Sequence, residues 1–138
     1  MKIKEKNMIT AEFKRTGSDR LSLVMNGHSG YSASEGDIVC AAASAILFTL
    51  IGYLSAPLCV PTNTTEENEQ GNSNKSENSG GLGLIINDIR SGYADIECGE
   101  RGKEAMRMAC IGLLQISEKY PACMKVRNQV WKSYICPY

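Results

Sequence analysis

Alternating hydrophobic and polar positions predict an antiparallel hairpin near the start of the chain. Ile9, Ala11 and Phe13 alternate with polar residues, and the same alternation resumes after a turn rich in glycine, serine and aspartate. A side-chain period of two is typical of a strand with one buried face. Residues 8–27 are therefore predicted to form two paired strands, and the glycine- and serine-rich residues 27–36 are predicted to form a loop.

An uncharged, mainly apolar run from Ile38 to Leu54 predicts a helix. Asp37 precedes the run, and aspartate is a preferred N-cap because its carboxylate accepts hydrogen bonds from the amides of the first turn. The helix is expected to end near Ser55 or Ala56, before Pro57. The run is shorter than the roughly 20 residues of a membrane span and includes several alanines, so we interpret it as a buried helix.

Residues 61–81 contain no hydrophobic side chain at all. Such a segment cannot bury enough apolar surface to offset the entropy of ordering. We predict a disordered, low-complexity insertion within a single domain that spans residues 8–138, preceded by an N-terminal extension at residues 1–7. A length of 138 residues is typical of one domain.

The rest of the chain predicts a second hairpin, a helix and a last strand. Strands are expected at 84–89 and 93–98, joined by a tight turn. Apolar residues at helical spacing predict an amphipathic helix over 100–119, and residues 124–132 predict a final strand. The order ββ-α-ββ-α-β indicates an α+β domain, a small sheet with two packed helices.

Charge and the start of the chain exclude several classes of protein. The 15 basic and 15 acidic residues give a formal net charge of zero. A general nucleic-acid binder would carry a clustered basic excess, so no direct nucleic-acid binding is expected. Residues 1–7 are charged and have no apolar stretch behind them, which is unlike a secretory signal. We therefore expect a cytoplasmic protein without membrane association.

The six cysteines include no C-x-x-C pair, which argues against a zinc ribbon or a thioredoxin-type site. Their even number leaves a disulfide arrangement open, but reduced thiols are the rule in the cytoplasm. No metal and no cofactor are predicted. All but Cys40 are interpreted as structural: Cys59, Cys98, Cys110, Cys123 and Cys136.

One histidine and one cysteine are placed where they could form a catalytic pair. His28, the single histidine, follows the second predicted strand, and Cys40 falls in the first turn of the predicted helix. A helix dipole of about 0.3–1 kcal/mol lowers the pKa of a cysteine from about 8.5 by less than one unit. Only a nearby imidazolium would make the thiolate dominant at neutral pH. The alternative interpretation is a loop histidine and a core cysteine.

Two further residues are candidates for supporting roles. Asp37 either caps the helix and so aims Cys40, or orients the imidazole as a third catalytic member. Ser44 lies one helical turn after Cys40 on the same face. It either forms a hydrogen bond near the site or packs in the core.

Two short motifs surround the pair: G-H-S-G-Y at 27–31 and D-I-V-C-A-A-A-S at 37–44. They closely resemble the signature of the ribosomal-processing cysteine proteases of the Prp family, G-H-x-x-Y followed after a short loop by D-I-V-C-A-A-x-S. The match fixes residue types, their order and the 12-residue spacing from His28 to Cys40 together. With the first hairpin and the late helix, the resemblance covers roughly residues 8–132.

The resemblance implies a cysteine endopeptidase with His28 and Cys40 as its catalytic dyad, an α+β fold and a homodimer. The implied activity is site-specific removal of the N-terminal extension of a large-subunit ribosomal protein. Cleavage would follow an aromatic residue and precede a small one. Residues 29–36 would form a lid over the substrate peptide, with glycine hinges. The residues assigned to this loop and lid are Gly27, Gly30, Tyr31 and Gly36.

Two other functions remain open on the sequence. The first is a non-catalytic ribosome-assembly or binding module with the same fold. The second is a redox-sensing or acyl-carrying thiol protein that uses Cys40 without proteolysis. The insertion at 61–81 and the tail at 132–138 depart from the family pattern, and neither touches the predicted dyad.

Overall fold

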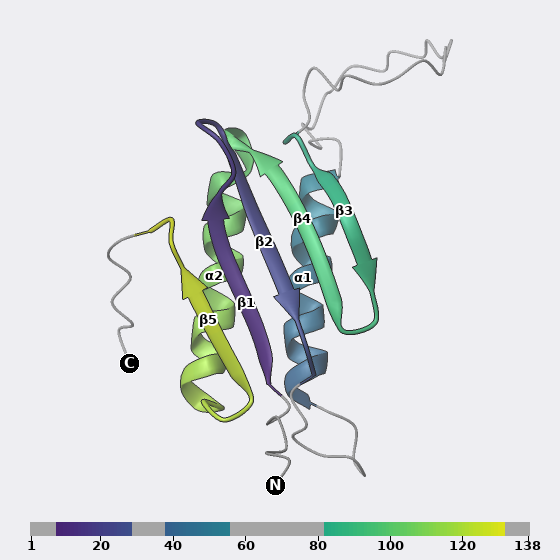
Figure 1. Cartoon of the computed structure of the whole chain (residues 1–138), viewed down its shortest axis with the longest axis vertical. Helices are drawn as coiled ribbons and strands as arrows, with labels where there is room; N and C mark the ends of the chain where they lie inside the picture. The colour runs from purple at the N-terminus through teal and green to yellow at the C-terminus, as the bar shows by residue number, and fades with distance from the viewer. Residues whose placement is uncertain (1–7, 29–37, 56–81, 132–138) are drawn as a thin grey trace, which may run out of the picture.

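The structure is a computed structural model, and it describes residues 8–28, 38–55 and 82–131. In them a five-stranded sheet is covered on one face by two helices (Figure 1). The elements are β1 (Ile9–Arg15), β2 (Arg20–Asn26), α1 (Ile38–Ser55), β3 (Ile85–Arg90), β4 (Tyr93–Gly99), a 3₁₀ turn (Glu100–Gly102), α2 (Lys103–Lys119) and β5 (Met124–Asn128). The predicted α+β class and element order are confirmed.

The sheet is mixed, with the strand order β3-β4-β2-β1-β5. The predicted first hairpin pairs β1 with β2 in antiparallel register, with Phe13 opposite Leu23. β4 pairs with β2, and β3 pairs with β4 at one edge, both antiparallel. At the other edge β5 runs parallel to β1, with Ile9 opposite Met124. The first and the last strand therefore lie side by side.

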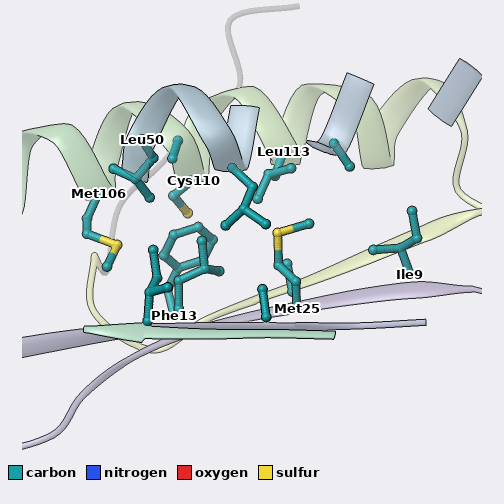
Figure 2. Close-up of a cluster of buried hydrophobic side chains, with 14 of the residues drawn as sticks. Ile9, Phe13, Met25, Leu50, Met106, Cys110 and Leu113 are labelled. Atoms are coloured by element: carbon teal, nitrogen blue, oxygen red, sulfur yellow. The ribbon is translucent and has the colours of Figure 1, made fainter. Parts of the chain in front are cut away.

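The core lies between one face of the sheet and the facing sides of both helices. The alternating residues Ile9, Ala11 and Phe13 of β1 are all buried, as the sequence pattern predicts. Burying one large apolar side chain contributes about 1.5–3 kcal/mol, so this layer is the main source of stability. Figure 2 shows the core with the helices on one side and the sheet on the other; the labelled side chains are Ile9, Phe13, Met25, Leu50, Met106, Cys110 and Leu113.

The opposite face of the sheet is polar. Glu97 of β4 accepts hydrogen bonds from the Asn87 amide at 3.0 Å and from the Thr16 hydroxyl at 2.8 Å. These two bonds lower the pKa of the Glu97 carboxyl because they favour its charged form. A sheet with one apolar and one polar face needs a helical layer on one side only, which gives the observed two-layer architecture.

Helix α1 has two faces that are both apolar. By length and composition alone it could cross a membrane. One stripe instead packs into the core of the domain and contains Val39, Ala43, Leu47, Leu50 and Leu54. The predicted buried helix is thus buried on one side only, because Phe48 and Tyr53 on the outer side are 57% and 56% exposed.

Two predicted boundaries are wrong. The helix expected over 100–119 begins with the 3₁₀ turn, where Gly102 is buried so closely that a Cβ would lie 2.9 Å from the Cys98 sulfur. The strand expected over 124–132 ends at Asn128, whose carboxamide oxygen accepts hydrogen bonds from the amides of Val130 at 3.0 Å and Trp131 at 2.9 Å. Such an Asx turn competes with the ladder and ends the strand.

Some predictions lie outside the described residues. They are the N-terminal extension at 1–7, both roles considered for Asp37, the lid residues Gly30, Tyr31 and Gly36, the insertion at 61–81, the tail at 132–138, and the structural role of Cys59 and Cys136. They stay predictions.

Candidate active site

Three segments that are distant in sequence meet at one end of the domain. They are the end of β2, the first turn of α1 and the turn between β3 and β4, which all lie toward the lower end of Figure 1. The strand pairing explains the meeting. Because β4 runs antiparallel to β2, with Tyr93 opposite Asn26, the β3–β4 turn lies at the same end of the sheet as the end of β2.

His28 directly follows β2 through a constrained glycine. Gly27 has a φ of +100°, a conformation that favours glycine. A Cβ at this position would collide with the carbonyl oxygen of Met8. The Gly27 amide donates a hydrogen bond of 2.9 Å to the carbonyl oxygen of Gly92 in the β3–β4 turn. The residue before the imidazole is thus tied to that turn, and whether Gly27 also acts as a hinge stays a prediction.

Cys40 is the third residue of α1 and is half-buried. This is the position that the sequence predicts, in the first helical turn. The residue is partly exposed and lines a pocket, and amides at a helix N-terminus favour negative charge nearby. Ser44 lies one turn further and is exposed rather than packed in the core.

A pocket of about 540 Å³ contains both predicted catalytic residues. His28 lines it from the end of β2, and Cys40 lines it from α1 together with Ser44. The structure therefore brings a thiol, an imidazole and a hydroxyl to one cavity. The apolar part of the wall consists of Ile9, Met25, Ala43, Leu47, Phe48, Ile89 and Ala94.

The β3–β4 turn supplies a wall that the sequence alone does not indicate. Gly92 of the turn and the adjoining strand residues Ile89, Arg90 and Tyr93 line the pocket. The Arg90 guanidinium lies 5.0 Å from the centre of the Tyr93 ring, a distance that suits a cation–π contact. The sequence predicts the tight turn itself. It does not predict that this turn lies beside His28, which follows only from the order of the strands in the sheet.

The arrangement suits nucleophilic attack on a bound apolar peptide. A thiol that loses its proton to a neighbouring imidazole is a strong nucleophile, and the same ring can return the proton to a leaving amine. The apolar wall can hold a hydrophobic side chain next to the two reactive groups.

The other described cysteines are unsuited to this chemistry. Cys98 and Cys110 are buried in the core, and burial raises the pKa of each thiol to about 11. Both stay protonated at neutral pH, so neither supplies a thiolate. Cys123 is also buried. These positions agree with the structural role expected for them.

We expect iodoacetamide to modify Cys40 well before Cys98 or Cys110 in the folded protein at pH 7.5. The reagent reacts with thiolates, and the two core thiols are both protonated and inaccessible. Peptide mapping by mass spectrometry at timed intervals measures the three rates, and urea-unfolded protein serves as the control in which the rates converge. Equal rates in the folded state would contradict the expectation.

A second, larger groove of about 870 Å³ runs between α1 and α2. Apolar side chains from both helices line it, together with Glu104 and Arg107, and neither His28 nor Cys40 reaches it. The smaller pocket, which both predicted catalytic residues line, is therefore the candidate active site. Within residues 8–28, 38–55 and 82–131, no group of three histidine, cysteine or acidic side chains is arranged to hold a metal ion.

Comparison with solved structures supports the fold. The ribosomal processing protease Prp from S. aureus, in complex with a covalently linked product peptide, is 20% identical with a TM-score of 0.59, over 88% of this chain and 100% of that chain. The same protease with a substrate peptide gives a TM-score of 0.57 at the same identity and coverage. SMU.848 from Streptococcus mutans is 20% identical over 91% of this chain and 97% of its own, with a TM-score of 0.53.

Comparison with protein families supports the same assignment. A search of curated proteins gives no match. The family model of the cysteine protease Prp matches residues 8–125, which include both strands of the first hairpin, α1 and its cysteine, and α2. This match covers most of the chain and agrees with the motifs around His28 and Cys40. The chain therefore belongs to the Prp family of cysteine proteases.

Proposed function

We propose that this protein is a site-specific endopeptidase that removes the N-terminal extension of a large-subunit ribosomal protein. His28 and Cys40 act as its catalytic dyad. It cuts after an aromatic residue and before a small one, in the cytoplasm, where ribosomal proteins are made. The observation that supports the proposal is the shared pocket, which His28 and Cys40 line from different elements together with apolar side chains.

The proposed reaction has two steps that use the same two side chains. The Cys40 thiolate attacks the scissile carbonyl, and the His28 imidazolium gives its proton to the leaving amine as the C–N bond breaks. His28 then takes a proton from water, whose oxygen attacks the thioester, and the thiolate leaves. Both residues return to their starting state.

The nature of the pocket supports the proposed substrate. Phe48 and Ile89 both line it, and apolar walls of this kind accept an aromatic side chain. The S. aureus relative is named a ribosomal processing protease, and one of its structures holds a covalently linked product peptide. Both points favour the same substrate class and a covalent mechanism for this chain.

The proposal is tested with matched peptides. The purified full chain is incubated with an apolar peptide that contains one Phe–Ala bond, and with the same peptide carrying Asp–Ala or Phe–Glu at that bond. We expect cleavage of the Phe–Ala peptide alone, with one cut between the two residues, identified by mass spectrometry. Cleavage of all three peptides would contradict the proposed specificity.

Two variants separate proteolysis from a contaminating protease or a misfolded sample. Cys40→Ser should be inactive in the same assay, while Ser55→Ala, at the exposed far end of the same helix, should cleave like the wild type. Equal inertness of wild type and Cys40→Ser toward several aromatic–small peptides would instead favour a non-catalytic ribosome-assembly or binding module.

A homodimer forms part of the proposal, and the outer helical face supports it. Tyr53 of α1 is 56% exposed and Met108 of α2 is 73% exposed, and both border the groove between the helices. Contiguous exposed apolar surface of this kind is typical of an interface. A second copy of the chain would cover it.

We expect Met108→Glu to convert the protein from dimer to monomer. A charge placed in an apolar interface loses its hydration without gaining a partner, which opposes association. Size-exclusion chromatography with light scattering gives the mass directly, and Ser18→Glu, in the exposed β1–β2 turn, is the control with the same added charge. A wild-type mass of about 15 kDa would contradict a dimer.

A further inference from the structure

The imidazole of His28 lies directly against a glycine in the β3–β4 turn. A Cβ built on Gly92 would be 2.6 Å from Nε2 of His28, 3.1 Å from Cε1 and 3.3 Å from Cδ2. Ordinary contacts between such heavy atoms are about 3.5–4.0 Å. The ring therefore occupies the space that a side chain at position 92 would need. A methyl group there would move the ring or the turn by about 1 Å.

The backbone of Gly92 is constrained by its conformation and by one hydrogen bond. Its φ of +77° lies in the left-handed region, which glycine adopts without strain. Its carbonyl oxygen accepts the hydrogen bond of 2.9 Å from the amide of Gly27, the residue immediately before His28. The same turn thus fixes the backbone that carries the ring and also contacts the ring itself.

We propose that Gly92 is a positioning residue for His28: its bare Cα and its bond to Gly27 fix the imidazole in the pocket that holds Cys40. The inference rests on the proposed function, in which this ring transfers protons to and from Cys40 and the substrate.

The contact matters because His28 is otherwise an exposed side chain at the end of a strand. An exposed imidazole samples several rotamers, and proton transfer needs one of them. A displacement of about 1 Å in catalytic geometry can lower a rate by about a hundredfold. The close approach of Gly92 to the ring restricts the positions that the imidazole can take.

Gly92→Ala tests the role through the reaction. We expect kcat to fall by about 10- to 100-fold with the Phe–Ala peptide, and the rate of Cys40 alkylation at pH 6.5 to fall by a similar factor. Gly17→Ala is the matched control, because Gly17 also has a positive φ, of +151°, but a Cβ there meets nothing within 4 Å. Its kinetics should match the wild type.

A double-mutant comparison distinguishes positioning from a general loss of structure. If Gly92 acts through the ring, Gly92→Ala should have no further effect on Cys40 alkylation in a His28→Ala background. An equal loss in both backgrounds would overturn the proposal, because it would show that position 92 acts on the pocket without the imidazole.

A second variant and an NMR measurement test the same role without relying on Gly92→Ala or on peptide turnover. Should Gly92→Ala fail to fold, Gly92→Asn replaces it, since asparagine tolerates a positive φ but still carries a Cβ. His28 is the only histidine, so its ring resonances are assigned in a proton NMR spectrum without further work. They should shift in the Gly92 variants and not in Gly17→Ala, even if the protein proves not to be a protease. Unchanged resonances would overturn the positioning role.

Discussion

Replacing Cys40 with serine is expected to reduce peptide turnover by roughly three orders of magnitude or more. The substitution exchanges one atom, sulfur for oxygen, in the first turn of α1, so the pocket keeps its shape. The pKa of a serine hydroxyl is far above that of a thiol. The imidazole of His28 is therefore a poor base for removing the hydroxyl proton. The loss therefore measures the nucleophile and not the fold.

The measurement is kcat/KM with the Phe–Ala peptide, accompanied by the thermal unfolding midpoint. An unchanged midpoint with lost turnover supports the nucleophile. Cys110→Ser is the comparison thiol, since Cys110 is buried in the core and does not line the pocket. Cleavage by Cys40→Ser at more than a tenth of the wild-type rate would contradict the assignment.

Replacing His28 with alanine is expected to lower kcat/KM by about 10²–10⁴-fold. It should also change the shape of the pH profile. A thiolate–imidazolium pair gives a bell-shaped profile whose two apparent pKa values belong to the pair. Without the ring, one limb of the bell-shaped profile should disappear. The remaining activity should then increase with pH, with a midpoint near the pKa of an ordinary cysteine, about 8.5.

A pH series of both initial rates and Cys40 alkylation checks this expectation. Because the chain has no second histidine, no other imidazole can substitute for the lost one. Addition of free imidazole should restore part of the rate in His28→Ala, since the alanine leaves space in the pocket wall. An unchanged, still bell-shaped alkylation profile would show that Cys40 is not coupled to the ring.

Much of the fold follows from local patterns in the sequence. The alternation of Ile9, Ala11 and Phe13 defines the buried face of β1, and Pro57 correctly places the end of α1 near Ser55. Local patterns fail where a side chain redirects the backbone. Asn128 ends β5 through its carboxamide, although the apolar residues Val130 and Trp131 that follow suggested a longer strand.

The sequence predicts the two reactive residues of the candidate site but not the residues that the second hairpin contributes to it. His28 and Cys40 stand out because of their residue types, their spacing and the motifs around them. Gly92 and Ile89 do not, since nothing local to the second hairpin shows that it packs beside the end of β2. That proximity is a property of strand order, which arises from long-range pairing and not from the periodicity of any one segment.

The parallel pairing of β1 with β5 has a consequence for biosynthesis. Ile9, one wall of the pocket, is bonded through its amide to the Cys123 carbonyl and lies opposite Met124. A nascent chain whose C-terminal part is still inside the exit tunnel lacks that neighbour, because β5 follows the other described strands in the sequence. The β1 edge therefore stays unpaired until β5 has been released, so the pocket wall at Ile9 should be completed only after β5 has left the ribosome.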